Sequence, residues 1–148
     1  MLQSQQQQFE NELRAVTELA RHTGAASDPI LRQRLAGAWM GLKLLRLSAL
    51  RTLGTDDPAA AREAMTGKLA WSTWHRDLGE LAMDVGAAES EIASEAGLTP
   101  LQRLFLFSRA DTIYAGTSEI QRNLIGERAL GLPPEPRLPL PATPGSRR

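Results

Sequence analysis

The residues best suited to chemistry lie in one polar stretch, Ile113-Tyr-Ala-Gly-Thr-Ser-Glu-Ile-Gln-Arg122. A helical pattern reaches Tyr114, is interrupted at Gly116 and resumes at Thr117. Glycine lets the backbone approach a ligand closely, because no Cβ stands in the way. Thr117 and Ser118 are favourable N-cap residues, so the free N–H groups of a new helix point toward the interruption and favour an anionic or oxygen-rich ligand. An ordinary capped corner between two helices explains the same pattern without a ligand.

This stretch and several others resemble the C-terminal signature of the acyl-CoA dehydrogenases, FAD-dependent enzymes that desaturate acyl-CoA thioesters. The late part comprises Tyr114-Ala-Gly-Thr-Ser-Glu-Ile-Gln-Arg122, Asn123-Leu-Ile-Gly-Glu-Arg128 and Gly131-Leu-Pro133. The earlier part comprises Arg21-His-Thr-Gly24, Asp28-Pro-Ile-Leu-Arg-Gln-Arg-Leu35 and Trp74-His-Arg-Asp-Leu-Gly-Glu-Leu-Ala-Met83. The resemblance predicts the C-terminal helical domain of this family with a shortened opening helix, without the N-terminal and middle domains.

The catalytic base of the family has no counterpart at its usual position. In the family, a carboxylate removes the α-proton of the thioester while hydride leaves the β-carbon for the flavin. Most members carry this base directly after the signature tyrosine, where Ala115 stands here. A methyl group accepts no proton, so we expect no catalytic residue in this chain and no activity of the chain alone. The alternative position of the base aligns before Met1, and neither Glu10 nor Glu12 aligns with it.

The resemblance assigns substrate contacts to Ala115 and Gly116. In the family, the backbone N–H at the base position helps to hold the thioester carbonyl, and alanine keeps this donor. A fixed donor aimed at developing enolate charge is worth roughly 2.7–4 kcal/mol. Gly116 would let the acyl group pass close to the backbone, although a glycine corner needs no ligand.

Four residues match FAD contacts of the family. Arg21 and Thr23 match an Arg-x-Thr pattern that reaches the FAD of a neighbouring subunit, and the guanidinium fork of Arg21 suits a pyrophosphate. Thr117 and Glu119 match residues that touch the phosphate and ribose side of the subunit's own FAD. Capping and surface ion pairs explain the same residue types without a cofactor.

The composition excludes several functional classes. Lys plus Arg and Asp plus Glu each number 17 among 148 residues, so no net charge favours nucleic acid or anionic lipid. Cysteine is absent, and the two histidines, His22 and His75, lack the spacing of metal ligands. No apolar run is long enough to span a membrane, and the glutamine-rich start is no signal peptide. We therefore expect a cytoplasmic protein that binds neither metal nor nucleic acid.

Apolar residues at helical spacing predict an all-α domain over residues 1–132. The expected helices cover residues 9 to about 22, 29–53, 59–85, 100–114 and a short fifth stretch, 117–130. Their starts carry a capping residue followed by proline at Asp28-Pro29, Asp57-Pro58 and Thr99-Pro100. Short connections favour an up-down four-helix bundle with a short fifth helix. Residues 133–148 hold six of the nine prolines, which predicts a flexible, disordered or extended tail.

The sequence leaves open the roles of one apolar helix face and of one cluster of aromatic residues. The second expected helix is apolar over much of its circumference, with Leu44 and Leu47 widening the stripe, so it lies centrally in a bundle or packs against another chain. In the third, Trp71, Trp74 and His75 lie on or beside the apolar stripe. Such a cluster is typical of a core, and a ligand pocket is the alternative.

The resemblance leads to two functional hypotheses. In the first, the chain is the FAD-contacting and oligomerisation domain of an acyl-CoA dehydrogenase, with an acyl-CoA as the substrate. In the second, it is a non-catalytic helical subunit that pairs with itself or with a complete dehydrogenase, as base-less subunits of the family do. Ala115 fits the second hypothesis as well as the first. The residues do not indicate the acyl chain length.

Overall fold

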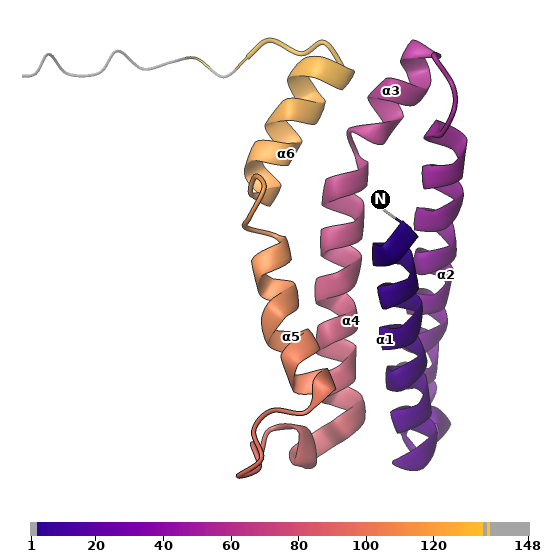
Figure 1. Cartoon of the computed structure of the whole chain (residues 1–148), viewed down its shortest axis with the longest axis vertical. Helices are drawn as coiled ribbons and strands as arrows, with labels where there is room; N and C mark the ends of the chain where they lie inside the picture. Colours follow the sequence, from indigo (N-terminus) through magenta and orange to yellow (C-terminus); the bar gives the residue numbers. More distant parts are fainter. Residues whose placement is uncertain (1–2, 135, 137–148) are drawn as a thin grey trace, which may run out of the picture.

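The computed structural model describes residues 3–134 and residue 136, and every regular element within them is helical. The elements are α1 (Gln3–His22), η1 (Ala25–Ser27), α2 (Pro29–Thr52), α3 (Pro58–Ala64), α4 (Gly67–Ser90), α5 (Pro100–Asp111), α6 (Ser118–Leu124) and a π-helical turn, η2 (Ile125–Ala129). Helices α1, α2, α4 and α5 form the up-down bundle, and α6 continues the course of α5 (Figure 1). The predicted all-α bundle with a short final helix is confirmed. No described helix is both long and apolar enough to cross a membrane.

The proline-rich tail predicted for residues 133–148 lies almost entirely outside the described residues.

Side-chain caps fix the helix starts that the sequence predicted. Asp28 Oδ1 accepts the backbone N–H groups of Ile30 and Leu31 at 2.8 and 2.9 Å, at the start of α2. Thr99 and Gln102 form a reciprocal capping box at the start of α5. These bonds satisfy N–H groups that a helix leaves free in its first turn. The starts of α2 and α5 are therefore encoded locally.

The single third helix predicted over residues 59–85 is wrong, because the chain breaks there into α3 and α4. At the break, both the backbone N–H and the hydroxyl of Thr66 donate to the carbonyl of Glu63, at 3.0 and 2.8 Å. Such local bonds offer the backbone an alternative to the helical ladder. Helix α4 then continues past Val85 to Ser90, although Ala87, with a φ of 49°, interrupts its regular geometry.

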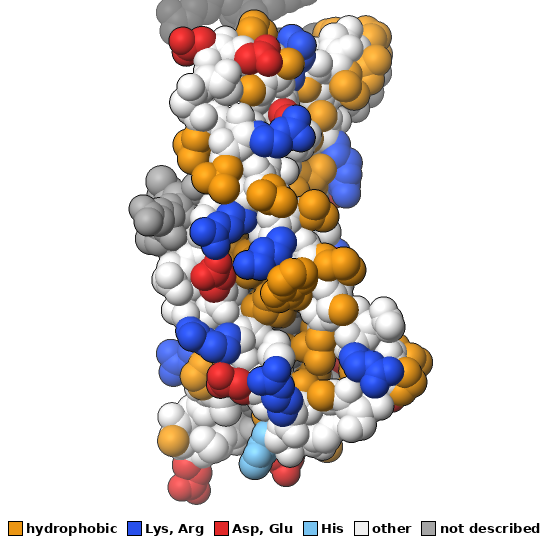
Figure 2. Space-filling model, turned by 90° about the vertical axis from the view of Figure 1, so that its right-hand side faces the viewer, with side chains coloured by type: hydrophobic (Ala, Val, Ile, Leu, Met, Phe, Trp, Pro, Cys, Tyr) orange, Lys and Arg blue, Asp and Glu red, His pale blue; other side chains and the backbone are white. Residues whose placement is uncertain are grey.

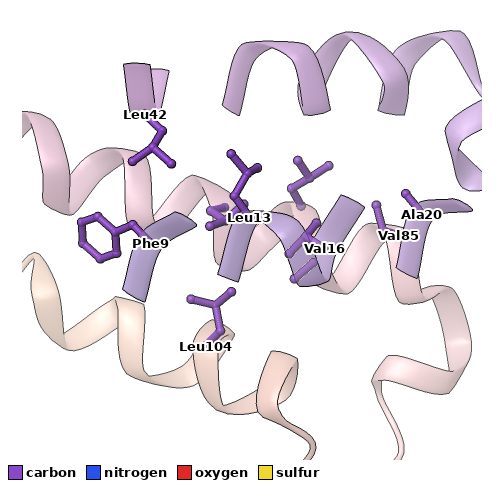
Figure 3. Close-up of a cluster of buried hydrophobic side chains, with 10 residues drawn as sticks. Phe9, Leu13, Val16, Ala20, Leu42, Val85 and Leu104 are labelled. Atoms are coloured by element: carbon purple, nitrogen blue, oxygen red, sulfur yellow. The ribbon is translucent and has the colours of Figure 1, made fainter. Parts of the chain in front are cut away.

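Helix α1 lies at the centre of the hydrophobic core. Its inward face carries four apolar residues at helical spacing, and each is at most 6% exposed: Phe9, Leu13, Val16 and Ala20. Figure 3 shows this face between Leu42 of α2 and Leu104 of α5. The buried residues of α4 complete the cluster: Leu78, Leu81, Ala82 and Val85. One contiguous core thus holds four helices together.

The Trp71, Trp74 and His75 cluster packs on this core, as the favoured interpretation of the sequence stated. The ring centroid of Phe9 lies 5.1 Å from that of Trp74 and 4.6 Å from that of His75. The indole N–H of Trp74 donates to the carbonyl of Ala38 at 2.8 Å, which ties α4 to α2.

Helices α4 and α5 approach each other closely at Gly79. A Cβ at this position would lie 2.6 Å from Ser108 Oγ and 3.0 Å from the Cα of Phe105, and a backbone atom cannot move aside. Gly37 of α2 offers a contrast, because a Cβ there would meet nothing within 4 Å. The close approach of α4 and α5 therefore requires a glycine at position 79, whereas the open space around Gly37 sets no such requirement.

Alanine substitutions at these two glycines are expected to have opposite effects. Gly79→Ala forces α4 and α5 apart and should lower the free energy of unfolding by about 1–3 kcal/mol. Gly37→Ala adds helix propensity in open space and should raise it by about 0.5–1 kcal/mol. Urea denaturation followed by circular dichroism measures both. Two shifts of the same sign would contradict the described packing of α4 on α5.

Candidate functional site

The polar corner, residues 112–117, lies at the surface between α5 and α6, where the sequence predicted an interruption. Two successive residues adopt left-handed backbone conformations, with φ of 53° at Ala115 and 98° at Gly116. A left-handed alanine is unfavourable by roughly 1–2 kcal/mol. Thr117 then caps α6 by accepting the N–H of Ile120 at 3.4 Å. The predicted break and restart are confirmed, and the backbone of the break is strained at a non-glycine residue.

Gly116 has a reason to be glycine within the chain itself. A Cβ on Gly116 would lie 2.7 Å from Nε2 of Gln121. This amide donates to the carbonyl of Ala115 at 3.2 Å and so closes the turn. The space that the missing side chain leaves is therefore occupied by the Gln121 amide.

The corner opens onto a polar hollow of about 380 Å³ that faces α4. Its walls carry hydroxyl and guanidinium groups from α4, α6 and the turn before α6: Thr73, Arg76, Thr112, Thr117, Ser118 and Arg122. The carboxylate of Glu119 also lies there, and Arg76 is paired with Asp77 at 3.0 Å, so each arginine of the hollow has a carboxylate nearby. Hydroxyl and guanidinium donors in such a set suit the oxygen atoms of a phosphate. Of these groups, sequence reasoning missed Arg76 and Arg122, which resemble ordinary surface arginines until the fold brings them together.

Glu119 stays ionised at the mouth of this hollow. Its own backbone N–H, then the Thr117 hydroxyl and the charge of Arg122, hold the pKa of its carboxyl below the usual value. The Arg122 guanidinium lies 3.9 Å away. An ionised carboxylate accepts hydrogen bonds, so this group can receive a sugar hydroxyl next to a phosphate.

Arg21 and Thr23 lie elsewhere in the molecule. The Thr23 hydroxyl donates to the carbonyl of Val85 at 3.2 Å, near the end of α4. Arg76, which lines the polar hollow, stands nine residues earlier on α4, about 14 Å along the helix. Arg21 instead lines a groove between α1 and α2, whose other charged residues are three basic and two acidic ones: Arg14, Lys43, Arg46, Glu10 and Glu18. Within a single copy of the protein, Thr117 and Glu119 therefore lie together, and Arg21 and Thr23 lie apart from them.

A buried chain of ionisable groups connects the corner to the bundle, and sequence reasoning missed it. His75 Nδ1 is hydrogen-bonded to Asp111 Oδ2, and His75 Nε2 to Glu12 Oε2 at 2.8 Å. Tyr114, in the corner, donates its hydroxyl proton to Asp111 Oδ1, and Lys68 Nζ donates to the Asp111 carbonyl. The side chains of His75 and Asp111 are 3% and 2% exposed. Glu12 is thus the partner of His75, and it does not line the hollow at the corner.

These contacts shift the pKa values of the groups involved. Burial by itself lowers the pKa of His75, but the hydrogen bonds and charges of Glu12 and Asp111 outweigh it, so the pKa is raised. The hydrogen bond to Asp111 also raises the pKa of Tyr114 to about 12. Burial lowers the pKa of Lys68 despite the attraction of Asp111. The imidazolium form of His75 therefore balances part of the negative charge of the two carboxylates.

Protonation of His75 is expected to stabilise the fold. Because its pKa is higher in the folded chain than its ordinary value of 6.5, folding favours the protonated form. This contribution is complete below about pH 6.5 and is lost as the pH rises through the folded-state pKa. Urea denaturation between mildly acidic and mildly basic pH should show the loss in the wild type. This loss of unfolding free energy with rising pH should disappear in His75→Gln and persist in the control His22→Gln. A pH dependence of stability in His75→Gln equal to that of the wild type would contradict the assignment to His75.

Comparison with a protein family supports the resemblance of the corner and its flanking helices. Residues 5–130 match the model of the family "Acyl-CoA dehydrogenase, C-terminal domain". The chain is also similar to two curated proteins called acyl-CoA dehydrogenase IpdE1. Identity is 47% over 131 residues with the protein of Mycolicibacterium smegmatis and 49% over 133 residues with that of Mycobacterium tuberculosis.

The chain spans about a third of the length of these relatives, 33% and 34%, while 88% of the chain is covered. Among solved structures, it is similar to a "Tcur3481-Tcur3483 steroid ACAD", with a TM-score of 0.71 and 20% sequence identity. That likeness covers 86% of this chain and 35% of the other, and it shows the fold. The family match over most of the bundle, corner included, shows that this chain belongs to the acyl-CoA dehydrogenases and corresponds to their C-terminal domain.

Proposed function

We propose that residues 1–132 act as the FAD-contacting and oligomerisation domain of an acyl-CoA dehydrogenase, with residues 133–148 as a flexible tail. The observation that carries this proposal is the family match over residues 5–130. The chain spans only a third of its relatives, so flavin-dependent desaturation of an acyl-CoA is proposed for the assembled enzyme. This chain contributes binding groups to that enzyme.

The FAD contacts fall on two regions. Thr117 and Glu119 contact the phosphate and ribose side of the FAD of the same subunit, and Arg76 and Arg122 of the polar hollow add charge for its phosphates. Arg21 and Thr23 contact the FAD of a neighbouring subunit. Arg21 lies at a groove that carries both basic and acidic side chains, and its guanidinium fork suits an approaching pyrophosphate.

The substrate contact is made by the backbone at the corner. The N–H of Ala115 donates to the thioester carbonyl, and Gly116 lets the acyl group pass close by. Ala115 supplies no proton acceptor, so the base comes from another part of the assembled enzyme. The chain alone should therefore show no acyl-CoA oxidation with an artificial electron acceptor, whether or not FAD is added.

FAD binding is the direct test of the proposed cofactor site. Fluorescence anisotropy of FAD titrated with the chain should show saturable binding. Arg122→Gln should raise the dissociation constant about tenfold, because a hydrogen bond to a charged group contributes about 1.5–3 kcal/mol. Arg62→Gln, an exposed arginine of α3 outside the polar hollow, is the matched control. Equal binding of riboflavin, which has no phosphate, or no binding of FAD would count against the phosphate site.

A second candidate function is that of a non-catalytic assembly subunit. The outer face of α2 favours it, because Met40, Leu44 and Leu47 recur at helical spacing and are each more than half exposed. Figure 2, which views the molecule from the α2 side, shows hydrophobic side chains along much of this face, with Lys and Arg side chains between them. Exposed apolar side chains gathered on one face of a helix are typical of an interface with another chain.

Charge placed on this face should prevent assembly. Light scattering should find that the wild-type chain forms oligomers. The double variant Leu44→Glu, Leu47→Glu should be a monomer, because burial of unpaired carboxylates at the interface is unfavourable. Ile92→Glu, which places a carboxylate at a 71% exposed position outside α2, is the control and should leave the oligomer intact. A wild-type chain that stays monomeric, even when mixed with a complete acyl-CoA dehydrogenase, would refute the assembly role.

A further inference from the structure

A second hollow, of about 900 Å³, lies between α1 and α5 and is separate from the corner. Its floor is the buried side chain of Leu104, and its apolar wall includes Leu106 and Phe107, which are 53% and 61% exposed. A concave surface of this size, lined mostly by apolar side chains with a few polar groups, is typical of sites for small organic molecules. The polar groups stand at two distinct places.

The acidic end of the α1–α5 hollow is formed by Glu12. Its Oε2 is bonded to His75 at 2.8 Å, and its Oε1 accepts the Gln8 amide at 2.9 Å. Each oxygen of a carboxylate can accept two hydrogen bonds, so Glu12, which lines the hollow, can accept a further hydrogen bond. The bond to buried His75, itself held by Asp111, fixes the position of this carboxylate.

The basic end is formed by Arg103. Its Nε donates to the carbonyl of Leu98 at 3.2 Å, which holds the guanidinium beside the start of α5. Asp111, at the level of the acidic end, lies eight residues further along α5, about 12 Å at 1.5 Å per residue. The surface between the two ends is apolar, with Leu104 and Phe107. The hollow therefore offers an acceptor at one end, a cationic donor at the other and an apolar strip between them.

We propose that the α1–α5 hollow is a binding site for an elongated apolar molecule that carries a hydroxyl group at one end and a carboxylate at the other. The hydroxyl group donates to Glu12, and the carboxylate pairs with Arg103. The apolar body covers Leu104 and Phe107. An ω-hydroxy fatty acid of medium length has this pattern, and the site involves neither the corner nor the polar hollow proposed for FAD.

Calorimetric titration with three probes of one chain length tests the proposal. The probes are ω-hydroxydecanoic acid, decanoic acid and decanol, each kept below the concentration at which it self-associates, and no flavin is added. The two-headed probe should bind at least about tenfold more tightly than either one-headed probe, because each charged hydrogen bond adds to the affinity. Equal affinity of all three would overturn the proposal and indicate unspecific apolar association.

Three variants separate the apolar body from the carboxylate end. Phe107→Ala should weaken the binding of the two-headed probe about tenfold. Ile30→Ala, which shortens an exposed apolar side chain of α2 (70% exposed, against 61% for Phe107), should leave the binding unchanged. Arg103→Gln should bring the affinity of the two-headed probe down to that of decanol. Because these side chains lie at the surface, the melting temperatures should stay within a few degrees of the wild type. Unchanged affinity in both Phe107→Ala and Arg103→Gln would place the probe elsewhere.

Discussion

The hydrogen-bonded chain Glu12–His75–Asp111 is the constraint on which the arrangement of helices depends. It joins α1, α4 and α5 through groups that are largely withdrawn from water. A buried charge is tolerated only with partners at close range, and removal of one partner leaves the others uncompensated. Apolar packing has no preferred direction, whereas these hydrogen bonds are directional and so restrict how α1, α4 and α5 can slide against one another. These bonds therefore help to set the register of α1, α4 and α5, whereas α2 joins the core through the apolar side chain of Leu42.

The two candidate sites lie at opposite ends of the hydrogen-bonded series Glu12–His75–Asp111. Tyr114 connects Asp111 to the corner, where Ala115 and Gly116 hold left-handed conformations. At the other end, Glu12 forms part of the wall of the α1–α5 hollow. A strained turn persists only where its surroundings hold it, and the Tyr114 hydroxyl is one such attachment. The corner is thus held by Asp111, three residues before Tyr114, and Asp111 is in turn bonded to the distant His75.

The sequence predicted most of the local features, but it missed one local break and the contacts between residues far apart in the sequence. The caps at Asp28 and Thr99 and the buried face of α1 follow from neighbouring residues, so the bundle could be foreseen. The break at Thr66 was missed because a threonine hydroxyl within a continuous apolar stripe gives no clear signal. The His75–Asp111 pair joins residues 36 positions apart, with no spacing rule to connect them. Arg76 and Arg122 share a hollow for the same reason, through folding alone.

The separation of Arg21 from Thr117 has a thermodynamic consequence for the proposed enzyme. If each copy lends one group of contacts to its own cofactor and the other to that of its neighbour, flavin affinity and assembly become linked quantities. A ligand that binds only the associated form shifts the association equilibrium toward that form by mass action. Association of the copies in turn raises the affinity for the ligand. Dilution would then release cofactor, and loss of cofactor would favour dissociation, without any change in the fold of a single copy.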